Sequence, residues 1–276
     1  MIPRHLILPD RGTLLVSTDL HGNAEDFLRL RQHFENLLQK DPQSRWLLLG
    51  DVVHGPDERA RQDQPEFYDF PDESYRIVEG IMDLQALHSR QVIFVLGNHD
   101  HGHVGGPRPA KFYPDEVQAL EQKLEPEQVA KLRAFFEEAV LAVAAPCGLL
   151  FCHGVPDDSL RDLCELDRIG LRPASKDGDG QHVLSCLLRA YGQQASVVER
   201  MFLQLDQAHP GLDLRMVIHG HDRDPEGFFV EEGNQICPVI FGALKEHKRY
   251  LVLDLAKRYE RPVSLREGKE IRRLYA

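Results

Sequence analysis

Five short apolar segments of this 276-residue chain each stop at a glycine beside an aspartate, asparagine or histidine, and this pattern constrains the fold most. The clearest segment is 91–100, QVIFVLGNHD, where an apolar run stops at Gly97 and Asn98, His99 and Asp100 follow. Such a run indicates a strand buried on both faces, as a central parallel strand is. In open α/β sheets, ligands bind just beyond the carboxyl ends of such strands. The segment therefore predicts a metal or phosphate site.

The other four apolar segments end in the same way. Residues 13–18 precede Asp19 and His21, 46–49 precede Gly50 and Asp51, 148–152 precede His153 and Gly154, and 214–218 precede His219, Gly220 and His221. Glycines here let the backbone or a ligand approach where a Cβ would clash. Turns and helix caps account for one or two such endings. All five together predict that the polar side chains converge.

The periodicity of the chain predicts an α/β fold. Helical spacing of apolar residues covers 24–40, with Asn23 as N-cap, and recurs at 74–88, 115–124, 127–144, 182–191 and 195–208. The first strand, the helix at 24–40 and the strand at 46–49 form a βαβ unit, which begins a parallel sheet. From Gly227 on, short strands at 228–230, 235–242 and 249–255 predict an antiparallel meander that closes the fold. We expect one domain over 1–276, with an inserted loop at about 56–73.

Two groups of side chains near the site have ordinary structural explanations. His101 and His103 lie in a glycine- and proline-rich stretch, 101–114, and we expect them to be solvated loop histidines. The aromatic residues Phe67, Tyr68 and Phe70 of the inserted loop are explained by local packing, and a ligand-binding loop is the alternative.

Composition limits the class of partner. The formal charge of −11 argues against sequence-independent binding of nucleic acid, which requires Lys and Arg side chains that contact the phosphates. No apolar run reaches the roughly 18–20 residues that span a bilayer, and we see no secretory signal. The five cysteines show no paired spacing. We therefore expect reduced thiols, no membrane span and a cytoplasmic location.

The side chains at the strand ends suit divalent metals. Mn²⁺, Fe²⁺ and Zn²⁺ accept mixed carboxylate, imidazole and amide ligands. The strand ends supply this mixture through Asp19, His21, Asp51, Asn98, His153 and His221. Two metals about 3.5–4 Å apart need one bridging carboxylate and flanking ligands.

In order along the chain, the five motifs resemble those of the calcineurin-like metallophosphoesterases. These are Asp19-Leu-His21, Gly50-Asp51, Gly97-Asn98-His99-Asp100, His153-Gly154 and Gly220-His221. Finer features, such as Phe151-Cys-His-Gly154 and Tyr191-Gly192, are similar to the phosphoprotein phosphatase branch, the serine/threonine protein phosphatases. The resemblance implies a four-layer α/β/β/α sandwich with two mixed sheets and flanking helices.

The resemblance also implies roles for residues. Asp19, His21 and Asp51 would hold the first of two divalent metals (Mn²⁺, or Fe and Zn), with Asp51 bridging. Asn98, His153 and His221 would complete the second metal site. A metal-bridging hydroxide would attack the phosphorus of a phosphomonoester, and His99 would protonate the leaving group as general acid.

The chain departs from the protein phosphatase pattern after Asp51. That branch has Asp-Arg-Gly where this sequence has His54-Gly55-Pro56, so the acidic partner of the general acid and a phosphate-binding arginine are both missing. Asp100 or His54 would have to orient His99. Arg59 or Arg61 would have to reach the phosphate from the loop, and we also expect His54 to bind the substrate.

A second phosphate-binding arginine is expected before Tyr191-Gly192. Arg189 is the nearest candidate, and an arginine on a helix surface is the alternative.

Three functions are consistent with the sequence. The first is a phosphatase acting on phosphoserine or phosphothreonine of a phosphorylated protein, or on a small phosphoester. The second is a nucleotide phosphoesterase resembling symmetrical diadenosine tetraphosphate hydrolases. The third is a binding protein that keeps the fold without catalysis, although all six presumed ligands and His99 are present.

Overall fold

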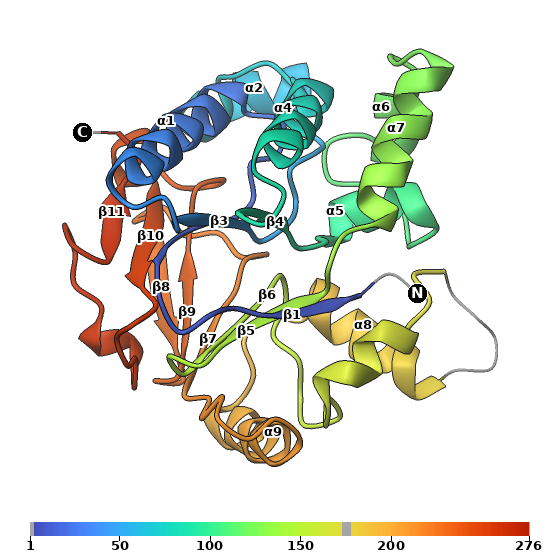
Figure 1. Cartoon of the computed structure of the whole chain (residues 1–276). Helices are drawn as coiled ribbons and strands as arrows, with labels where there is room; N and C mark the ends of the chain where they lie inside the picture. Colours follow the sequence, from blue (N-terminus) through green and yellow to red (C-terminus); the bar gives the residue numbers. More distant parts are fainter. Residues whose placement is uncertain (1–2, 173–177, 276) are drawn as a thin grey trace.

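A computed structural model describes residues 3–172 and 178–275. Its strands form two mixed sheets that face each other (Figure 1). The six-stranded sheet has the order β1 (His5–Ile7), β5 (Ala142–Ala145), β6 (Leu149–Cys152), β7 (Met216–Ile218), β9 (Gln235–Pro238) and β8 (Phe228–Glu231). The five-stranded sheet has the order β11 (Ile271–Arg273), β10 (Arg249–Asp254), β2 (Thr13–Ser17), β3 (Arg45–Leu48) and β4 (Val92–Phe94).

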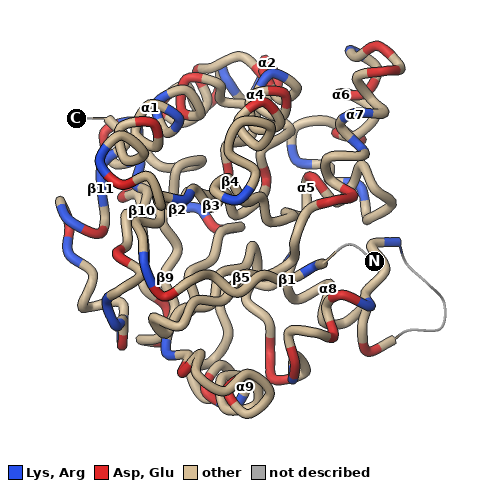
Figure 2. Tube along the Cα trace, viewed as in Figure 1, with Lys and Arg blue, Asp and Glu red and all other residues tan. Residues whose placement is uncertain are grey.

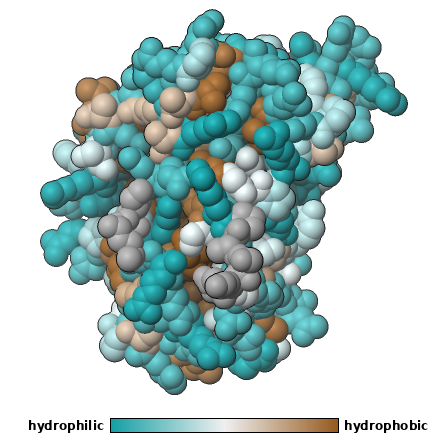
Figure 3. All heavy atoms as spheres, turned by 90° about the vertical axis from the view of Figure 1, so that its right-hand side faces the viewer, coloured by the Kyte–Doolittle hydropathy of each residue, from teal (hydrophilic) through white to brown (hydrophobic). Residues whose placement is uncertain are grey.

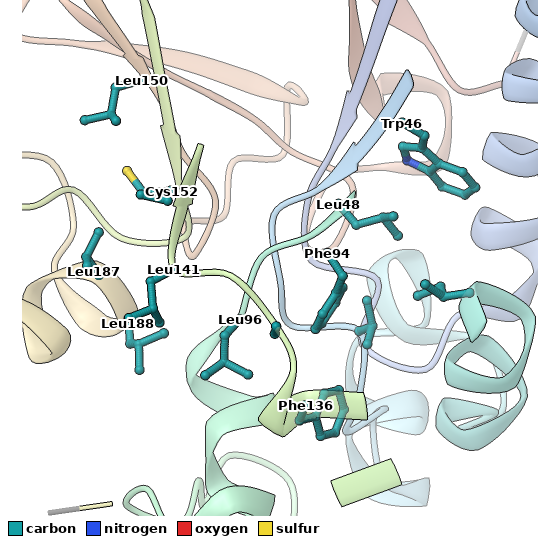
Figure 4. Close-up of a cluster of buried hydrophobic side chains, with 14 of the residues drawn as sticks. Trp46, Leu48, Phe94, Leu96, Phe136, Leu141, Leu150, Cys152, Leu187 and Leu188 are labelled. Atoms are coloured by element: carbon teal, nitrogen blue, oxygen red, sulfur yellow. The ribbon is translucent and has the colours of Figure 1, made fainter. Parts of the chain in front are cut away.

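The strands are apolar on both faces because each sheet is covered twice. Leu14 and Val16 of β2 pack in the core between the sheets, whereas Leu15 packs in the core beneath the helices. Trp46 and Leu48 of β3 face the same helical side, as Figure 4 shows. The period of two residues in a strand explains this alternation. It also explains why the strand sequences lack the polar positions of a one-sided sheet.

Helices cover the outer face of each sheet. α1 (Ala24–Lys40) contacts β2 and β3, and α4 (Ser74–Leu87) contacts β4. On the other side, α8 (Gly178–Arg189) and α9 (Ala195–Ala208) cover the six-stranded sheet (Figure 1). The four-layer α/β/β/α arrangement expected from the sequence is thereby confirmed.

The N-terminus of α1 forms as the sequence indicates. The side chain of Asn23 accepts a hydrogen bond of 3.1 Å from the backbone N–H of Asp26, which satisfies one free donor of the first turn. This cap begins the helix immediately after the motif that carries Asp19 and His21.

The predicted helix at 127–144 is wrong in its second half. α7 (Pro126–Glu137) ends early, and the apolar residues that follow form β5 between β1 and β6. A short apolar run fits a buried helix and a buried strand equally well. These residues form a strand because they pair with β1, a strand that the periodicity did not indicate.

The predicted C-terminal antiparallel strands form, but they do not make one continuous meander. β8 and β9 form an antiparallel hairpin in the six-stranded sheet, but β10 crosses to the five-stranded sheet and pairs with β2 and β11. Strands from both ends of the chain thus share a sheet. We retain on this ground the proposal of one domain over 1–276.

The predicted loop at 56–73 holds two short helices, α2 (Glu58–Asp63) and α3 (Pro65–Tyr68). Other short elements are α5 (Asn98–His101), which carries site residues, α6 (Glu116–Glu121) and 3₁₀ turns at Gly102–Val104, Leu163–Arg168, Lys245–His247 and Pro262–Ser264. The side chain of Asp57 caps α2 by accepting from the N–H of Ala60 at 2.7 Å.

Charged residues lie mainly on the outer helices and loops, whereas the central strands carry few (Figure 2). The face shown in Figure 3 is mostly hydrophilic, with hydrophobic side chains in scattered patches. Across the described part of the chain, no helix combines the length and apolar character that crossing a membrane requires.

Candidate metal centre

The structure brings the polar ends of five strands together. Asp19, Asp51 and Asn98 follow the parallel strands β2, β3 and β4, while His153 and His221 follow the parallel strands β6 and β7 of the other sheet. A hydrogen bond of 2.7 Å from Nδ1 of His153 to the carbonyl of Leu49 joins the two sheets at this edge. The expectation that six side chains converge therefore agrees with the geometry.

The backbone is strained at this edge. Seven non-glycine residues of the described chain have positive φ, and five belong to the site: Asp19, His21, Asp51, His54 and His221. Left-handed backbone is costly for such residues, and it clusters at functional sites because the surrounding structure imposes it. The concentration of strain marks this edge as the functional site.

Glycines permit the close approach that the sequence pattern suggested. A Cβ on Gly97 would lie 2.2 Å from Oδ1 of Asp51, and a Cβ on Gly220 would lie 2.7 Å from Oδ2 of Asp19. Any larger residue would therefore displace a carboxylate of the site.

Asp51 belongs to two groups of potential ligand atoms. Its carboxylate lies with His21 and His99 in one group and with His153 and His221 in the other, and the donor atoms of each group lie within 4.8 Å of one another. Oδ2 of Asp51 is 3.8 Å from Nε2 of His21 and 3.3 Å from Nε2 of His153. One carboxylate thus faces both halves of the site, as a bridging ligand would.

Asn98 completes the second half. One terminal atom of its amide lies 2.8 Å from Nδ1 of His221 and 3.1 Å from both Oδ2 of Asp51 and Nε2 of His153. With nitrogen in this place the amide donates to these atoms, and with oxygen it offers a metal ligand. Asp19 completes the first half, with Oδ1 3.9 Å from Nε2 of His21.

The carboxylates concentrate negative charge. Burial raises the pKa of Asp19 above the usual range. Burial would also raise the pKa of Asp51, but the nearby His153 and His99 hold it well below the usual range. Although burial opposes a charged imidazole at His153, Asp51 and Asp19 raise its pKa. The site therefore attracts positive charge, whether a proton or a metal cation.

Two other histidines are held neutral. Burial lowers the pKa of His21 and of His221 well below the usual range. Nδ1 of His21 donates to the carbonyl of His54 at 3.2 Å, so Nε2 is the nitrogen that faces the carboxylates. A neutral imidazole with one fixed tautomer is the form that ligates metals. The donor set and its orientation therefore fit two divalent cations.

His99 lies beside Asp51 and meets an acidic partner that the sequence analysis missed. Its Nδ1 is 3.0 Å from Oε2 of Glu116, and both side chains are buried. Glu116 begins α6, far from the motifs. The backbone N–H of His99 donates to Oδ1 of Asp51 at 2.8 Å, which fixes the residue next to the site.

Asp100 does not orient His99 through its carboxylate. Its two oxygens accept hydrogen bonds from the backbone N–H groups of Asp51 (2.7 Å), Val52 (3.2 Å) and Gly97 (2.9 Å). Asp100 therefore shapes the loop that presents Asp51. The idea that it partners His99 is corrected by these contacts.

His54 contacts His99 but is closed to substrate. It is 2% exposed, and its ring nitrogens lie 3.0 Å from Nδ1 of His99 and 2.9 Å from Nε2 of His103. Both nitrogens are thus engaged, which contradicts its assignment as a substrate-binding residue. His103 in turn contacts Glu121 at 2.9 Å.

The prediction that His101 and His103 are solvated loop residues is wrong. Both are buried, at 3% and 5% exposure. Nε2 of His101 lies within hydrogen-bonding distance of the carbonyl of Leu171, at 2.5 Å. The glycine-rich composition of this stretch concealed a folded turn that packs under the site.

The positively charged side chains near the site are not the loop arginines that the sequence indicated. Arg59 has an 87% exposed side chain and pairs with Asp63, and no contact among the described residues joins it to the site. Arg61 pairs loosely with Asp69, at 3.8 Å. The structure thus gives no support for Arg59 or Arg61 as phosphate-binding residues.

Lys111 lies nearer. Its ammonium group is 4.2 Å from the ring centroid of Phe241, the ring that packs on His21 at 4.0 Å. Desolvation and the nearby Arg223 lower the pKa of Lys111 to about 8, while Asp19 acts in the opposite direction. Lys111 is therefore coupled electrostatically to the site, and no motif signalled it.

Arg189 also has an electrostatic link to the site. It ends α8 and is half-buried, which lowers its pKa, while the nearby Asp51 opposes this shift. It remains a candidate for binding phosphate.

A pocket of about 330 Å³ opens beside His221. Tyr191 lies on the same side, its ring centroid 4.9 Å from that of His221, and Arg223 donates to the hydroxyl of Tyr68 at 3.2 Å. The lining comprises Gln64, Phe67, Tyr68, Tyr191, His221, Asp222, Arg223, Pro225 and Gly242. The pocket is thus aromatic, polar and continuous with the second half of the candidate centre.

The fold and this site define a metal-dependent phosphoesterase. The chain belongs to the calcineurin-like phosphoesterase family, whose sequence model matches residues 12–224. A search of curated proteins finds no match.

Solved structures that share the fold include two phosphatases. A protein serine/threonine phosphatase from Saccharomyces cerevisiae superposes with a TM-score of 0.57 at 18% identity, over 90% of this chain and 75% of that one. A cold-active protein-tyrosine phosphatase of a Shewanella species superposes with a TM-score of 0.59 at 11% identity, over 93% and 78%. At these identities the likeness concerns the fold alone.

Proposed function

We propose that this protein is a dinuclear-metal phosphomonoesterase. Asp19, His21 and Asp51 would hold one divalent cation, and Asn98, His153 and His221 would hold the other together with Asp51. The single observation that carries the proposal is the position of the Asp51 carboxylate, which belongs to both groups of ligand atoms. Manganese, iron and zinc are the metals that this mixture of oxygen and nitrogen ligands suits.

When bound, the two cations would supply an activated water and positive charge opposite the phosphoryl oxygens. The residues of this chain would do the rest. Lys111 and Arg189 would add positive charge around the phosphate. His99 would give its Nε2 proton to the departing alkoxide, since Nδ1 is turned toward Glu116.

We assign Glu116 as the residue that positions His99. Its buried Oε2 makes no hydrogen bond of good geometry and lies 3.0 Å from Nδ1 of His99 and 3.5 Å from Nδ1 of His54, while Oε1 accepts from the N–H of Phe112 at 2.7 Å. A buried carboxylate beside Nδ1 fixes the ring and favours its charged form. It thereby takes the place of the aspartate missing after Asp51.

Glu116→Gln is expected to lower kcat by about 10–100-fold with little change in KM, the loss typical of removing an orienting partner. The loss should be larger for an alkyl phosphate than for p-nitrophenyl phosphate, because only the alkoxide needs a proton. Steady-state kinetics on both substrates measure this difference. Glu127→Gln, on the exposed face of α7, is the matched control. Equal losses on both substrates would argue against the role.

For the substrate class, we propose phosphoserine or phosphothreonine. The supporting features are the motifs that resemble the protein phosphatase branch and the fold shared with a yeast phosphatase of that class. A second candidate, a nucleotide phosphoesterase, is favoured by the pocket beside His221, whose aromatic side chains could stack a base.

Hydrolysis assays with Mn²⁺ present test the proposal. We expect release of phosphate from p-nitrophenyl phosphate, loss of that activity with a chelator, and recovery on adding Mn²⁺. Faster turnover of a phosphoserine peptide than of diadenosine tetraphosphate would support the first substrate class, and the reverse order the second. No hydrolysis of any substrate, with metal loaded, would favour the remaining alternative, a catalytically inactive binding protein.

We further propose that the protein works in a reducing compartment such as the cytoplasm. All five cysteines are free thiols, and three of them (Cys147, Cys152 and Cys237) are buried. This agrees with the usual state of cytoplasmic cysteines.

A further inference from the structure

A second kind of ligand cluster lies outside the candidate centre. Asp157 follows β6 and His153 by a few residues, and His182 and Cys186 stand one turn apart on α8. Their donor atoms all lie within 4.8 Å of one another. Nε2 of His182 is 2.8 Å from Oδ2 of Asp157 and 3.7 Å from Sγ of Cys186.

The geometry argues against a catalytic thiol. In a Cys-His-Asp relay, the thiol and the carboxylate contact different nitrogens of the imidazole. Here the same nitrogen faces both. Burial and the nearby Asp157 also raise the pKa of Cys186 to about 11, so the thiol is not activated.

The same geometry suits a tetrahedral cation. With Zn–N of about 2.0–2.1 Å and Zn–S of about 2.3 Å, neighbouring ligand atoms lie roughly 3.3–3.6 Å apart. The observed separations of 2.8 and 3.7 Å bracket this spacing, so small side-chain rotations would suffice.

The carboxylate is already oriented. Oδ1 of Asp157 accepts from the N–H and the hydroxyl of Ser159 at 3.0 and 2.5 Å, which leaves Oδ2 directed at His182. Supporting hydrogen bonds of this kind are what hold metal ligands in place.

We propose that Asp157, His182 and Cys186 form a third metal site, which binds one Zn²⁺ ion with water as the fourth ligand. The thiolate and imidazole select zinc over magnesium or manganese. The candidate dinuclear centre, by contrast, has no cysteine among its proposed ligands, so the two sites differ in metal preference.

The bound zinc would fix the position of α8 relative to the end of β6, which carries His153. A hydrogen bond of 2.6 Å from the N–H of Gly154 to the carbonyl of Leu187 already joins these segments. Arg189, at the end of α8, would be held in place by the same contact. The inference does not depend on the proposed phosphatase activity.

Titration of the whole chain with Co²⁺, followed by absorption spectroscopy, tests the proposal. A thiolate bound to Co²⁺ gives a charge-transfer band in the near ultraviolet, which imidazole, amide and carboxylate ligands do not give. We expect one equivalent of this band, and its displacement by Zn²⁺. Cys186→Ser should abolish the band, and Asp157→Asn should weaken Co²⁺ binding at this site at least about tenfold.

Cys164→Ser is the matched control, because Cys164 lies in a similar cluster with Asp162 and His209. There Oδ1 of Asp162, the oxygen that faces Nε2 of His209 at 2.8 Å, already accepts from the N–H of Cys164 at 2.8 Å, and Nε2 of His209 accepts from the N–H of Leu163 at 3.3 Å. Cys164→Ser should therefore keep the band. Absence of the band in the parent protein, its survival in Cys186→Ser, or its loss in Cys164→Ser would overturn the proposal. Circular dichroism checks that each variant is folded.

Discussion

Asp51→Asn is expected to abolish metal loading and turnover together. The Asp51 carboxylate faces His21 and His153 from the two halves of the site, so its negative charge serves both proposed cations. An amide presents one neutral oxygen and cannot bridge two cations in the same way. We expect turnover to fall by on the order of a thousandfold or more, and metal analysis to find little or no bound metal.

Metal analysis of the purified protein and hydrolysis of p-nitrophenyl phosphate check this result. The variant should fold, because the asparagine oxygen can still accept from the N–H of His99. Asp63→Asn, an exposed aspartate of α2, is the control for handling and expression. If Asp51→Asn retains two equivalents of metal and near-normal turnover, another residue is the bridge.

The convergence of the site was predictable because it follows from topology. Buried parallel strands place their carboxyl ends at one edge of a sheet. Asp19, Asp51 and Asn98 share such an edge, and His153 reaches them from the second sheet through the carbonyl of Leu49. The motifs thus sufficed to place these side chains, although they are far apart in the chain.

Glu116 and Lys111 were not predictable for a physical reason. Lys111 lies within the glycine- and proline-rich stretch 101–114, where no apolar periodicity indicates the path of the backbone, and the same stretch leaves the direction of the helix that carries Glu116 unspecified. His101 and His103 were misjudged on the same composition. Their burial depends on the packing of α5 and the next turn against other elements, which the local sequence does not encode.

The error at residues 138–145 has another origin. The run is apolar at nearly every position, so a helical and an extended chain would both bury it. The choice depends on β1 and β6, whose strands flank β5 through parallel and antiparallel pairing. Non-local pairing of this kind overrides local preference.

His99→Asn is expected to lower turnover by roughly 10²–10⁴-fold while the metals stay bound, if His99 is the general acid. Asparagine keeps the backbone N–H that donates to Asp51 but has no proton to give at neutral pH. The loss should be greatest for alkyl phosphates, whose leaving alkoxide is strongly basic, and smallest for p-nitrophenyl phosphate. Rates for a series of leaving groups, together with metal analysis, measure both effects.

The dependence of the rate on the basicity of the leaving group distinguishes a chemical role of His99 from a structural one. His88→Asn, at the opposite end of β4 from the site, is the control and should leave the rates unchanged. A general acid makes the rate nearly independent of the basicity of the leaving group, and its removal introduces a steep dependence. Because Glu116 acts through His99, Glu116→Gln should add little to the loss in His99→Asn. Rates that fall equally for all leaving groups, or fully additive losses in the double variant, would instead make His99 a residue that only shapes the site.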